Sequence, residues 1–222
     1  MQFNLPKCLM AGAIAVACSS AFADSFDIKV SGVIKPAACT PTLAGGGTFD
    51  YGNIGTAALN PTALTLLDVK SDTLTITCDA VARVALKGAD NRAGTGAFTS
   101  AVGFFGLNVG ANWQYGLGTA SGKNIGSYAF RFKPGTFTAD GAKVDSIDSA
   151  NAGSSWTSSS GFLASNGSWI GSWAKTGLTV PVAAKVFTGT LELQAAIDKT
   201  SNLDMSKQID LDGLASVSLV YL

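Results

Sequence analysis

Apolar residues recur at every second position in several short stretches of the chain, and clusters of glycine and serine separate these stretches. In residues 26–35, FDIKVSGVIK, the side chains of Phe26, Ile28 and Val30 fall on one side of an extended backbone. This two-residue repeat is typical of a β-strand with one buried face. Pro36 ends the stretch, because proline cannot continue a paired ladder. Similar strand patterns occupy the following ranges: 64–80, 81–91, 127–133, 180–197 and 215–222.

No window of the chain favours a long helix, since the 26 glycines and the Ser/Thr/Gly clusters interrupt almost every one. The patterning therefore predicts an all-β sandwich with turn-rich connections. A chain of 222 residues can bury one substantial core. We expect a single domain over residues 24–222.

Residues 1–23 are predicted to be a signal peptide. Lys7 precedes an apolar run, and residues 21–23, Ala-Phe-Ala, match a small-x-small cleavage pattern, so the mature chain would begin at Asp24. Two alternatives stay open, a membrane anchor and lipidation at Cys18. The apolar run is short for a membrane span. Export through the periplasm is the expectation.

Removal of the signal peptide leaves Cys39 and Cys78 in an oxidising compartment, where two such thiols are expected to pair. The bridge would close a loop of about 40 residues and stabilise the fold by about 3–4 kcal/mol in the chain-entropy model. A metal site is the alternative reading. Two thiols in a chain without histidine are a poor ligand set for it, so no metal is expected.

Composition argues against nucleic-acid binding and against catalysis. The net charge is zero, with 15 basic and 15 acidic residues and no block of like charge. The absence of histidine excludes Ser-His-Asp and Cys-His catalysis. No phosphate-binding, dinucleotide-binding or calcium motif is complete, and a carboxylate pair such as Asp145 and Asp148 is equally typical of a solvated loop. We therefore expect no enzyme activity and no cofactor.

The region from about residue 93 to 176 is rich in glycine and serine and contains all four tryptophans. It is expected to be an insertion in the sandwich, and a long, mobile one is conceivable. Trp156, Trp169 and Trp173 lie among small polar residues, where aromatic faces and hydroxyls together are typical of glycan contacts. The alternative is that these rings fill the core or cover a sheet edge.

Several sequence blocks resemble subunits of chaperone-usher pili. These are VSGVIKPAAC (30–39), LTITCDA (74–80) and the penultimate tyrosine of SVSLVYL (216–222). Further blocks are similar to the narrower beta-fimbriae type, a fimbrial-like family of largely unknown function: YGNI (51–54), VALKGADNRAGT (84–95), GKNIGSY (122–128) and IDLDGLASVSLVYL (209–222). The resemblance covers nearly the whole mature chain.

The resemblance implies an immunoglobulin-like, pilin-type β-sandwich that lacks its last strand. A periplasmic chaperone would insert a strand into the open groove, and the N-terminal extension of a neighbouring subunit would replace it at an outer-membrane usher. The resemblance further implies that Ala215, Val217, Leu219 and Tyr221 face the core, that the last strand pairs with the incoming strand, and that the carboxylate of Leu222 binds basic residues of the chaperone. Alternation alone equally fits a final core strand without a partner.

By the same resemblance Cys39 and Cys78 would tie the first strand to the end of the second, and Phe26, Ile28 and Val30 would be the donor side chains. The sequence departs from the pilin pattern in two respects. Only residues 24–29 precede the part that matches the first strand, and six residues reach only about 20 Å. A glycine that pilins often place about fourteen residues from the end is absent, and Gly213 lies nearer the terminus.

These observations predict an exported structural or adhesive subunit of a fimbria, assembled by donor-strand exchange and found in the periplasm and then at the cell surface. Expected partners are the chaperone, the usher, neighbouring subunits and a surface or host glycan. The alternative is a stand-alone secreted or periplasmic carbohydrate-binding module that uses Trp156, Trp169 and Trp173.

Overall fold

The computed structural model describes residues 26–35 and 37–222. The chain divides into two units, residues 1–35 and 36–222. The predicted signal peptide and the cleavage site before Asp24 lie outside the described residues. Within the described ranges no helix is long and apolar enough to cross a membrane.

The predicted all-β class is confirmed, since the described chain contains strands and short 3-10 turns but no α-helix. The strands are β1 (Cys39–Leu43), β2 (Thr65–Leu66), β3 (Lys70–Ala82), β4 (Val84–Asp90), β5 (Tyr115–Gly116), β6 (Thr119–Ala120), β7 (Lys123–Asn124), β8 (Gly126–Phe132), β9 (Thr138–Ala139), β10 (Ala142–Ser149), β11 (Thr157–Ser158), β12 (Ile170–Lys175), β13 (Ala184–Ile197) and β14 (Ala215–Tyr221). The 3-10 turns are η1 (Thr56–Ala58), η2 (Phe104–Gly106), η3 (Ala111–Trp113) and η4 (Thr200–Asn202).

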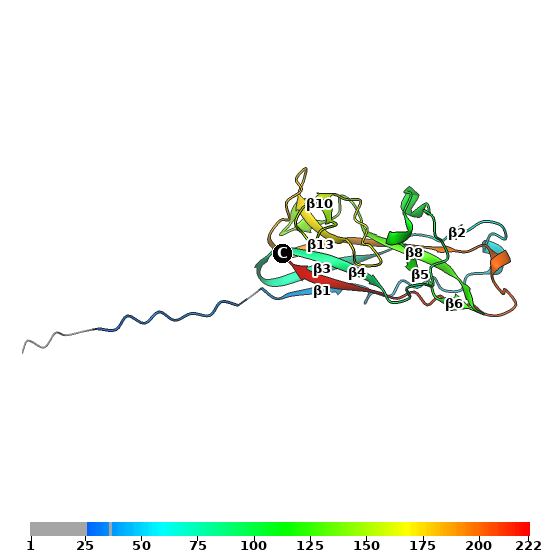
Figure 1. Cartoon of the computed structure of the whole chain (residues 1–222), viewed down its shortest axis with the longest axis horizontal. Coiled ribbons are helices and arrows are strands. Elements are labelled where there is room, and N and C mark those ends of the chain that lie inside the picture. Colours follow the sequence, from blue (N-terminus) through cyan, green and yellow to red (C-terminus); the bar gives the residue numbers. More distant parts are fainter. Residues whose placement is uncertain (1–25, 36) are drawn as a thin grey trace, which may run out of the picture. The chain divides into compact units, whose positions relative to one another are not determined.

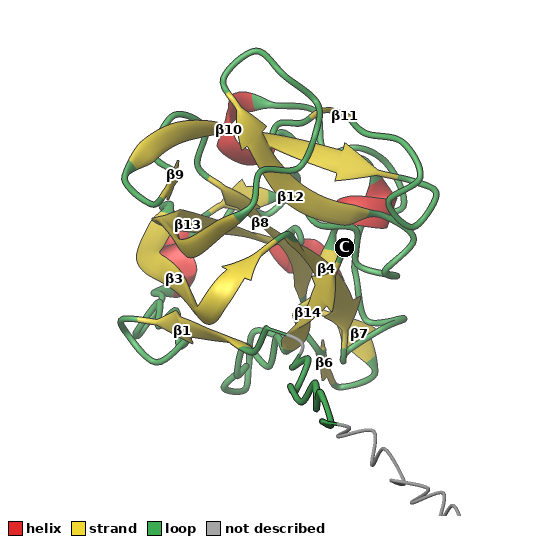
Figure 2. Cartoon of the chain, turned by 90° about the vertical axis from the view of Figure 1, so that its left-hand side faces the viewer, coloured by secondary structure: helices red, strands yellow, loops and turns green. Residues whose placement is uncertain are grey.

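Most strands join one antiparallel, 12-stranded sheet that curls into a nearly closed, barrel-like sandwich (Figure 2). Its strand order is β1-β3-β13-β9-β10-β12-β4-β14, and β8 pairs with the second half of β13. The two end strands pair on one side only, β1 with β3 and β14 with β4. In Figure 1 the red β14 lies between β4 and the blue β1. The sheet therefore ends in two edges on the same side of the sandwich.

The core is centred on Trp173 in β12, whose side chain is fully buried. Its ring packs on Phe132, Phe137 and Phe187, with ring centroids 5.0, 4.9 and 5.4 Å away. Such aromatic pairs contribute about 0.5–1.5 kcal/mol each beyond the area that they bury. Because the three phenylalanines come from β8, from the turn before β9 and from β13, this cluster joins β12 to the strands on the other side of the core.

Residues 93–176 do not form the expected insertion. They supply β8, β10 and β12, which are strands of the main sheet. Sequence patterning missed β12 because both of its faces are buried and small residues such as Gly171 and Ser172 hide the alternation. It missed β10 because polar residues, among them Asp145, Ser146 and Asp148, fall on both faces of that strand. Only a part of the region, residues 97–114, covers the outer face of β8 and β13, where Phe104 packs against Ala129 and Ala196.

The strand predicted at residues 26–35 is also corrected, since this segment pairs with no strand of the described chain. Its apolar side chains are almost fully exposed. A two-residue repeat forms a strand only where a neighbouring edge supplies hydrogen-bond partners. The first paired strand is β1, which begins at Cys39, so the segment that precedes it is longer than the sequence suggested.

The predicted disulfide is confirmed and joins Cys39 in β1 to Cys78 in β3. The two residues face each other in the β1/β3 register, with Cα atoms 4.0 Å apart. That close spacing is typical of a non-hydrogen-bonded pair in an antiparallel ladder. β1 has only 5 residues and pairs with one strand, so the disulfide helps to hold the start of β1 against β3.

Replacing both cysteines, Cys39→Ser with Cys78→Ser, should lower the free energy of unfolding by about 3–4 kcal/mol, because the loop between them is no longer closed in the unfolded chain. Urea unfolding of the variant and of the oxidised unmodified chain under the same conditions measures the difference. A reducing agent should destabilise the unmodified chain alone. Equal stability of the two proteins would contradict the assigned role of the disulfide.

Candidate functional site

An open groove of about 750 Å³ lies between β14 and β1. Leu43 of β1 and Val217 of β14 line its two sides. Its floor consists of core side chains from β8 and β13: Tyr128, Phe130, Leu191, Leu193, Ala195 and Ile197. Leu193 is half-buried and the other floor side chains are buried, and no further strand of the described chain lies over them between the two sheet edges.

Two loops, residues 47–59 and 203–214, form the end of the groove away from the disulfide. The first loop is held by Tyr51, whose hydroxyl donates to the carbonyl of Asp68 and accepts the N–H of Ala195, both at 3.1 Å. Burial raises the pKa of Tyr51 to about 12, partly offset by the bond from Ala195. The hydroxyl therefore stays protonated at neutral pH and can keep both bonds.

β14 uses only every second residue to pair with β4. The N–H of Asn91 donates to the carbonyl of Leu214 at 2.9 Å, and the N–H of Leu222 to the carbonyl of Arg83 at 3.1 Å. In the antiparallel register these bonds mark the even-numbered residues as those that pair with β4. The odd-numbered residues direct their backbone groups to the groove, and no described residue bonds to these groups: Ala215, Val217, Leu219 and Tyr221.

β1 also faces the groove with its odd-numbered residues. The N–H of Asp79 in β3 donates to the carbonyl of Ala38 at 3.0 Å, which places the even-numbered residues of β1 on the β3 side. Cys39, Pro41 and Leu43 therefore direct their backbone groups toward β14. Because proline has no N–H, Pro41 leaves a gap in the donors of this edge.

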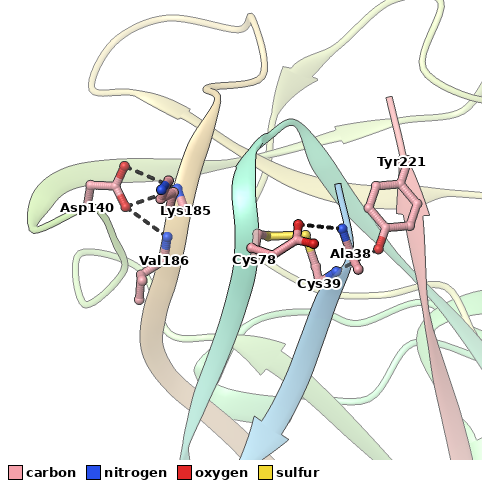
Figure 3. Close-up of a disulfide and its surroundings, with 8 residues drawn as sticks. Ala38, Cys39, Cys78, Asp140, Lys185, Val186 and Tyr221 are labelled. Carbon is pink, nitrogen blue, oxygen red and sulfur yellow. Dashed lines mark hydrogen bonds between the residues drawn. A yellow bond between two sulfur atoms is a disulfide. The ribbon is translucent and has the colours of Figure 1, made fainter. Parts of the chain in front are cut away.

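The side chain of Tyr221 reaches across one end of the groove to β1 (Figure 3). Its hydroxyl accepts a hydrogen bond from the N–H of Cys39 at 2.7 Å. The disulfide to Cys78 lies beside this bond, and the N–H of Ala38 is held by Asp79 Oδ1 at 2.8 Å. We call the contact between Tyr221 and Cys39 the Tyr221 bridge. It joins the end of β14 to the start of β1, beyond the residues that line the groove, and was not predicted from the sequence.

The other side chains of β14 that were predicted to face the core do so in part. Ala215 and Leu219 pack against the core, whereas Val217 is 42% exposed and lines the groove. Tyr221 is corrected, because it is 51% exposed and forms the bridge instead. Leu222 is 44% exposed, and its N–H is bonded to Arg83 in the ladder with β4.

The predicted donor side chains Phe26, Ile28 and Val30 are 84%, 80% and 93% exposed. Gly32 and Ile34 continue the same alternation, so that the apolar side of the segment runs from residue 26 to 34. Nine residues span about 30 Å when extended. The sequence predicted a donor extension of only six residues, 24–29. Because the first paired strand begins at Cys39, the extension is longer than predicted.

The tryptophans predicted to contact glycans differ in exposure. Trp173 is fully buried in the core, so its predicted role as a glycan contact is wrong. Trp156 and Trp169 are half-buried. The indole N–H of Trp156 donates to the carbonyl of Gly153 at 3.1 Å, and Trp169 packs on Trp113 with ring centroids 5.9 Å apart. Both rings thus already have intramolecular contacts. Among the described residues no cluster of histidine, cysteine and carboxylate side chains is placed to hold a metal ion.

A family model described as "Protein of unknown function (DUF1120)" matches residues 28–129. The chain is 34% identical over 254 residues to protein GltF of Escherichia coli K12, an alignment that covers 99% of this chain and 98% of that protein. It is also 29% identical over 239 residues to the uncharacterized protein YhcF of the same organism, covering 99% of this chain and all of YhcF. Both relatives therefore match along essentially their whole length.

The one-sided pairing of β14 predicts an alternating pattern of amide hydrogen exchange. In the unassembled chain the amides of Val217 and Leu219 should exchange at least about tenfold faster than those of Ser218 and Val220, because only the even-numbered residues bond to β4. NMR-detected exchange measures this directly. Residues 74–77 of β3 are the internal control, because they are paired with β1 on one side and β13 on the other and their neighbouring amides should be protected alike. Equal protection along β14 would show that its outer edge is already paired.

Proposed function

The chain belongs to the DUF1120 family, and from its open groove we propose that it is an exported structural or adhesive subunit of a fimbria whose sandwich is completed by a strand from another polypeptide. The proposed fold is the pilin variant of the immunoglobulin-like sandwich. Its proposed role is in cell adhesion and biofilm formation.

The observation that carries the proposal is the unpaired edge of β14 beside an apolar floor. Each backbone hydrogen bond that an added strand completes contributes about 1 kcal/mol net. Each large apolar side chain that it buries contributes about 1.5–3 kcal/mol. An unpaired edge of this kind promotes aggregation when it stays uncovered. An added strand pairs with the edge through its backbone, while its alternate side chains pack over the floor.

Residues 26–34 have the properties that such a strand requires. Their apolar side chains alternate with polar ones at Asp27, Lys29 and Ser31, and they are exposed rather than packed. Their reach of about 30 Å exceeds the roughly 24 Å spanned by the seven residues of β14. We therefore assign the segment of one copy as the donor and the groove of another copy as the acceptor.

In this proposal a periplasmic chaperone covers the groove first, and a neighbouring subunit replaces it at an outer-membrane usher. The subunit moves from the periplasm to the cell surface. Leu222, which is 44% exposed beside the end of β14, is the proposed contact for the chaperone. The proposal includes no catalytic step and no cofactor. We do not propose the carbohydrate-binding module, since no feature of the described chain favours it over the groove.

Complementary variants test the assembly. Val217→Arg places a charged side chain in the groove, and Ile28→Asp with Val30→Asp makes the donor segment polar. Neither variant should assemble alone. Their mixture should form a one-to-one heterodimer, because one partner keeps a functional groove and the other keeps a functional segment. Analytical ultracentrifugation measures the masses, and far-UV circular dichroism checks that each variant is folded.

Ser218→Arg is the matched control, because neighbouring side chains of a strand point to opposite faces and Ser218 is exposed. This variant should assemble like the unmodified chain. The absence of a heterodimer from two folded variants, or assembly of the Val217→Arg variant alone, would overturn the proposal.

A further inference from the structure

The Tyr221 bridge fixes the relative direction of the two groove edges. Tyr221 is the last residue of β14, and Cys39 is the first residue of β1. β1 and β14 therefore run in opposite directions along the groove. A strand between them is antiparallel to one edge and parallel to the other, and the antiparallel ladder is the more stable of the two.

The chain's own donor segment could enter its groove in only one direction. Residues 26–35 precede β1 with only residues 36–38 between them. If the segment folded back into its own groove, it would form a hairpin with β1, and a loop of this length is common in hairpins. It would then be antiparallel to β1 and parallel to β14. The antiparallel hydrogen bonds of such a hairpin would have to come from β1.

β1 is poorly equipped to supply these bonds. The N–H of Cys39 is bonded to Tyr221, Pro41 has no N–H, and the carbonyl of Leu43 accepts the N–H of Gly46 at 3.1 Å. Among the described residues the groups left on this edge are the N–H of Leu43 and the carbonyls of Cys39 and Pro41. β14, in contrast, presents both the N–H and the carbonyl of every odd-numbered residue.

The bridge also crosses the path of a self-inserted segment. The loop of such a hairpin would lie at the start of β1, so that the strand would pass between Tyr221 and Cys39. The hydrogen bond between these residues would have to break first. A strand from a second copy that runs antiparallel to β14 has its N-terminal end on this side, and it can stop before the bridge.

We propose that the Tyr221 hydroxyl and Pro41 together exclude the chain's own segment, residues 26–34, from its groove and so leave the groove to the same segment of a second copy. This inference rests on the proposed strand exchange. It identifies Tyr221 and Pro41 as the residues that decide whether the groove takes the chain's own segment or the segment of a partner. Tyr221 acts here as a positioning residue, since its hydroxyl occupies the N–H of Cys39 at the start of the β1 edge.

The double variant Tyr221→Phe with Pro41→Ala tests the inference. The first change removes only the hydroxyl, and the second restores an N–H to the β1 edge. The probe is a fluorescent peptide with the sequence of residues 26–35, added to the mature chain at concentrations too low for assembly. The double variant should bind the peptide about tenfold more weakly than the unmodified chain, because its own segment then fills the groove in about nine of ten molecules.

The matched control adds Ile28→Asp and Val30→Asp to the double variant, which disables its own segment but not its groove. Peptide binding should return to the level of the unmodified chain. Persistent weak binding would mean that the substitutions damage the groove, and it would overturn the inference. Unchanged binding by the double variant would overturn it as well and leave strand exchange standing. If the unmodified chain does not bind the peptide at all, the proposed function fails, and the inference fails with it.

Discussion

β14 pairs with β4 through its even-numbered residues and presents the backbone groups of its odd-numbered residues to an open groove. Folded domains are stable by only about 5–15 kcal/mol. A row of unpaired backbone groups is a substantial free energy on that scale, since each new hydrogen bond contributes about 1 kcal/mol and each apolar side chain that an added strand buries contributes somewhat more. The stability of this sandwich therefore depends on what occupies the groove.

The two edges of the groove are chemically unequal. β14 offers alternating donors and acceptors along its length, whereas β1 is short, is tied to β3 by the disulfide and lacks most of its free N–H groups. Proline and capped donors are common means of protecting sheet edges from unwanted pairing. Here they protect only one of two facing edges. The groove thereby favours a strand that runs antiparallel to β14, and the disulfide supports this selectivity by fixing the position of Cys39.

The sequence predicted the parts of this architecture that depend on local alternation. β4, β13 and β14 fall within predicted strand ranges, and β3 and β8 match such ranges except at one end, because apolar residues recur at every second position in these stretches. The disulfide followed from two cysteines in an exported chain. β12 escaped prediction because burial on both faces removes the alternation, and β10 because polar residues fall on both of its faces. The burial of Trp173 was not predicted, because the aromatic cluster around it is assembled from distant segments.

The candidate site was less accessible to sequence reasoning. Residues 26–35 have a strand pattern but no partner strand, and no pattern reveals whether an alternating segment will be paired within its own chain. The Tyr221 bridge joins residues 182 positions apart, and only the folded chain brings them together. The importance of Pro41 likewise depends on the β1/β3 register, which decides that its missing N–H lies on the groove side.

The central claim is that another polypeptide completes this sandwich, and an experimental structure of the assembled protein tests it most directly. The account predicts residues 26–34 of one copy in the groove of the next, antiparallel to β14 and hydrogen-bonded to the backbone of Val217 and Leu219. It would be contradicted by a stable, monomeric mature chain whose groove is filled by its own residues.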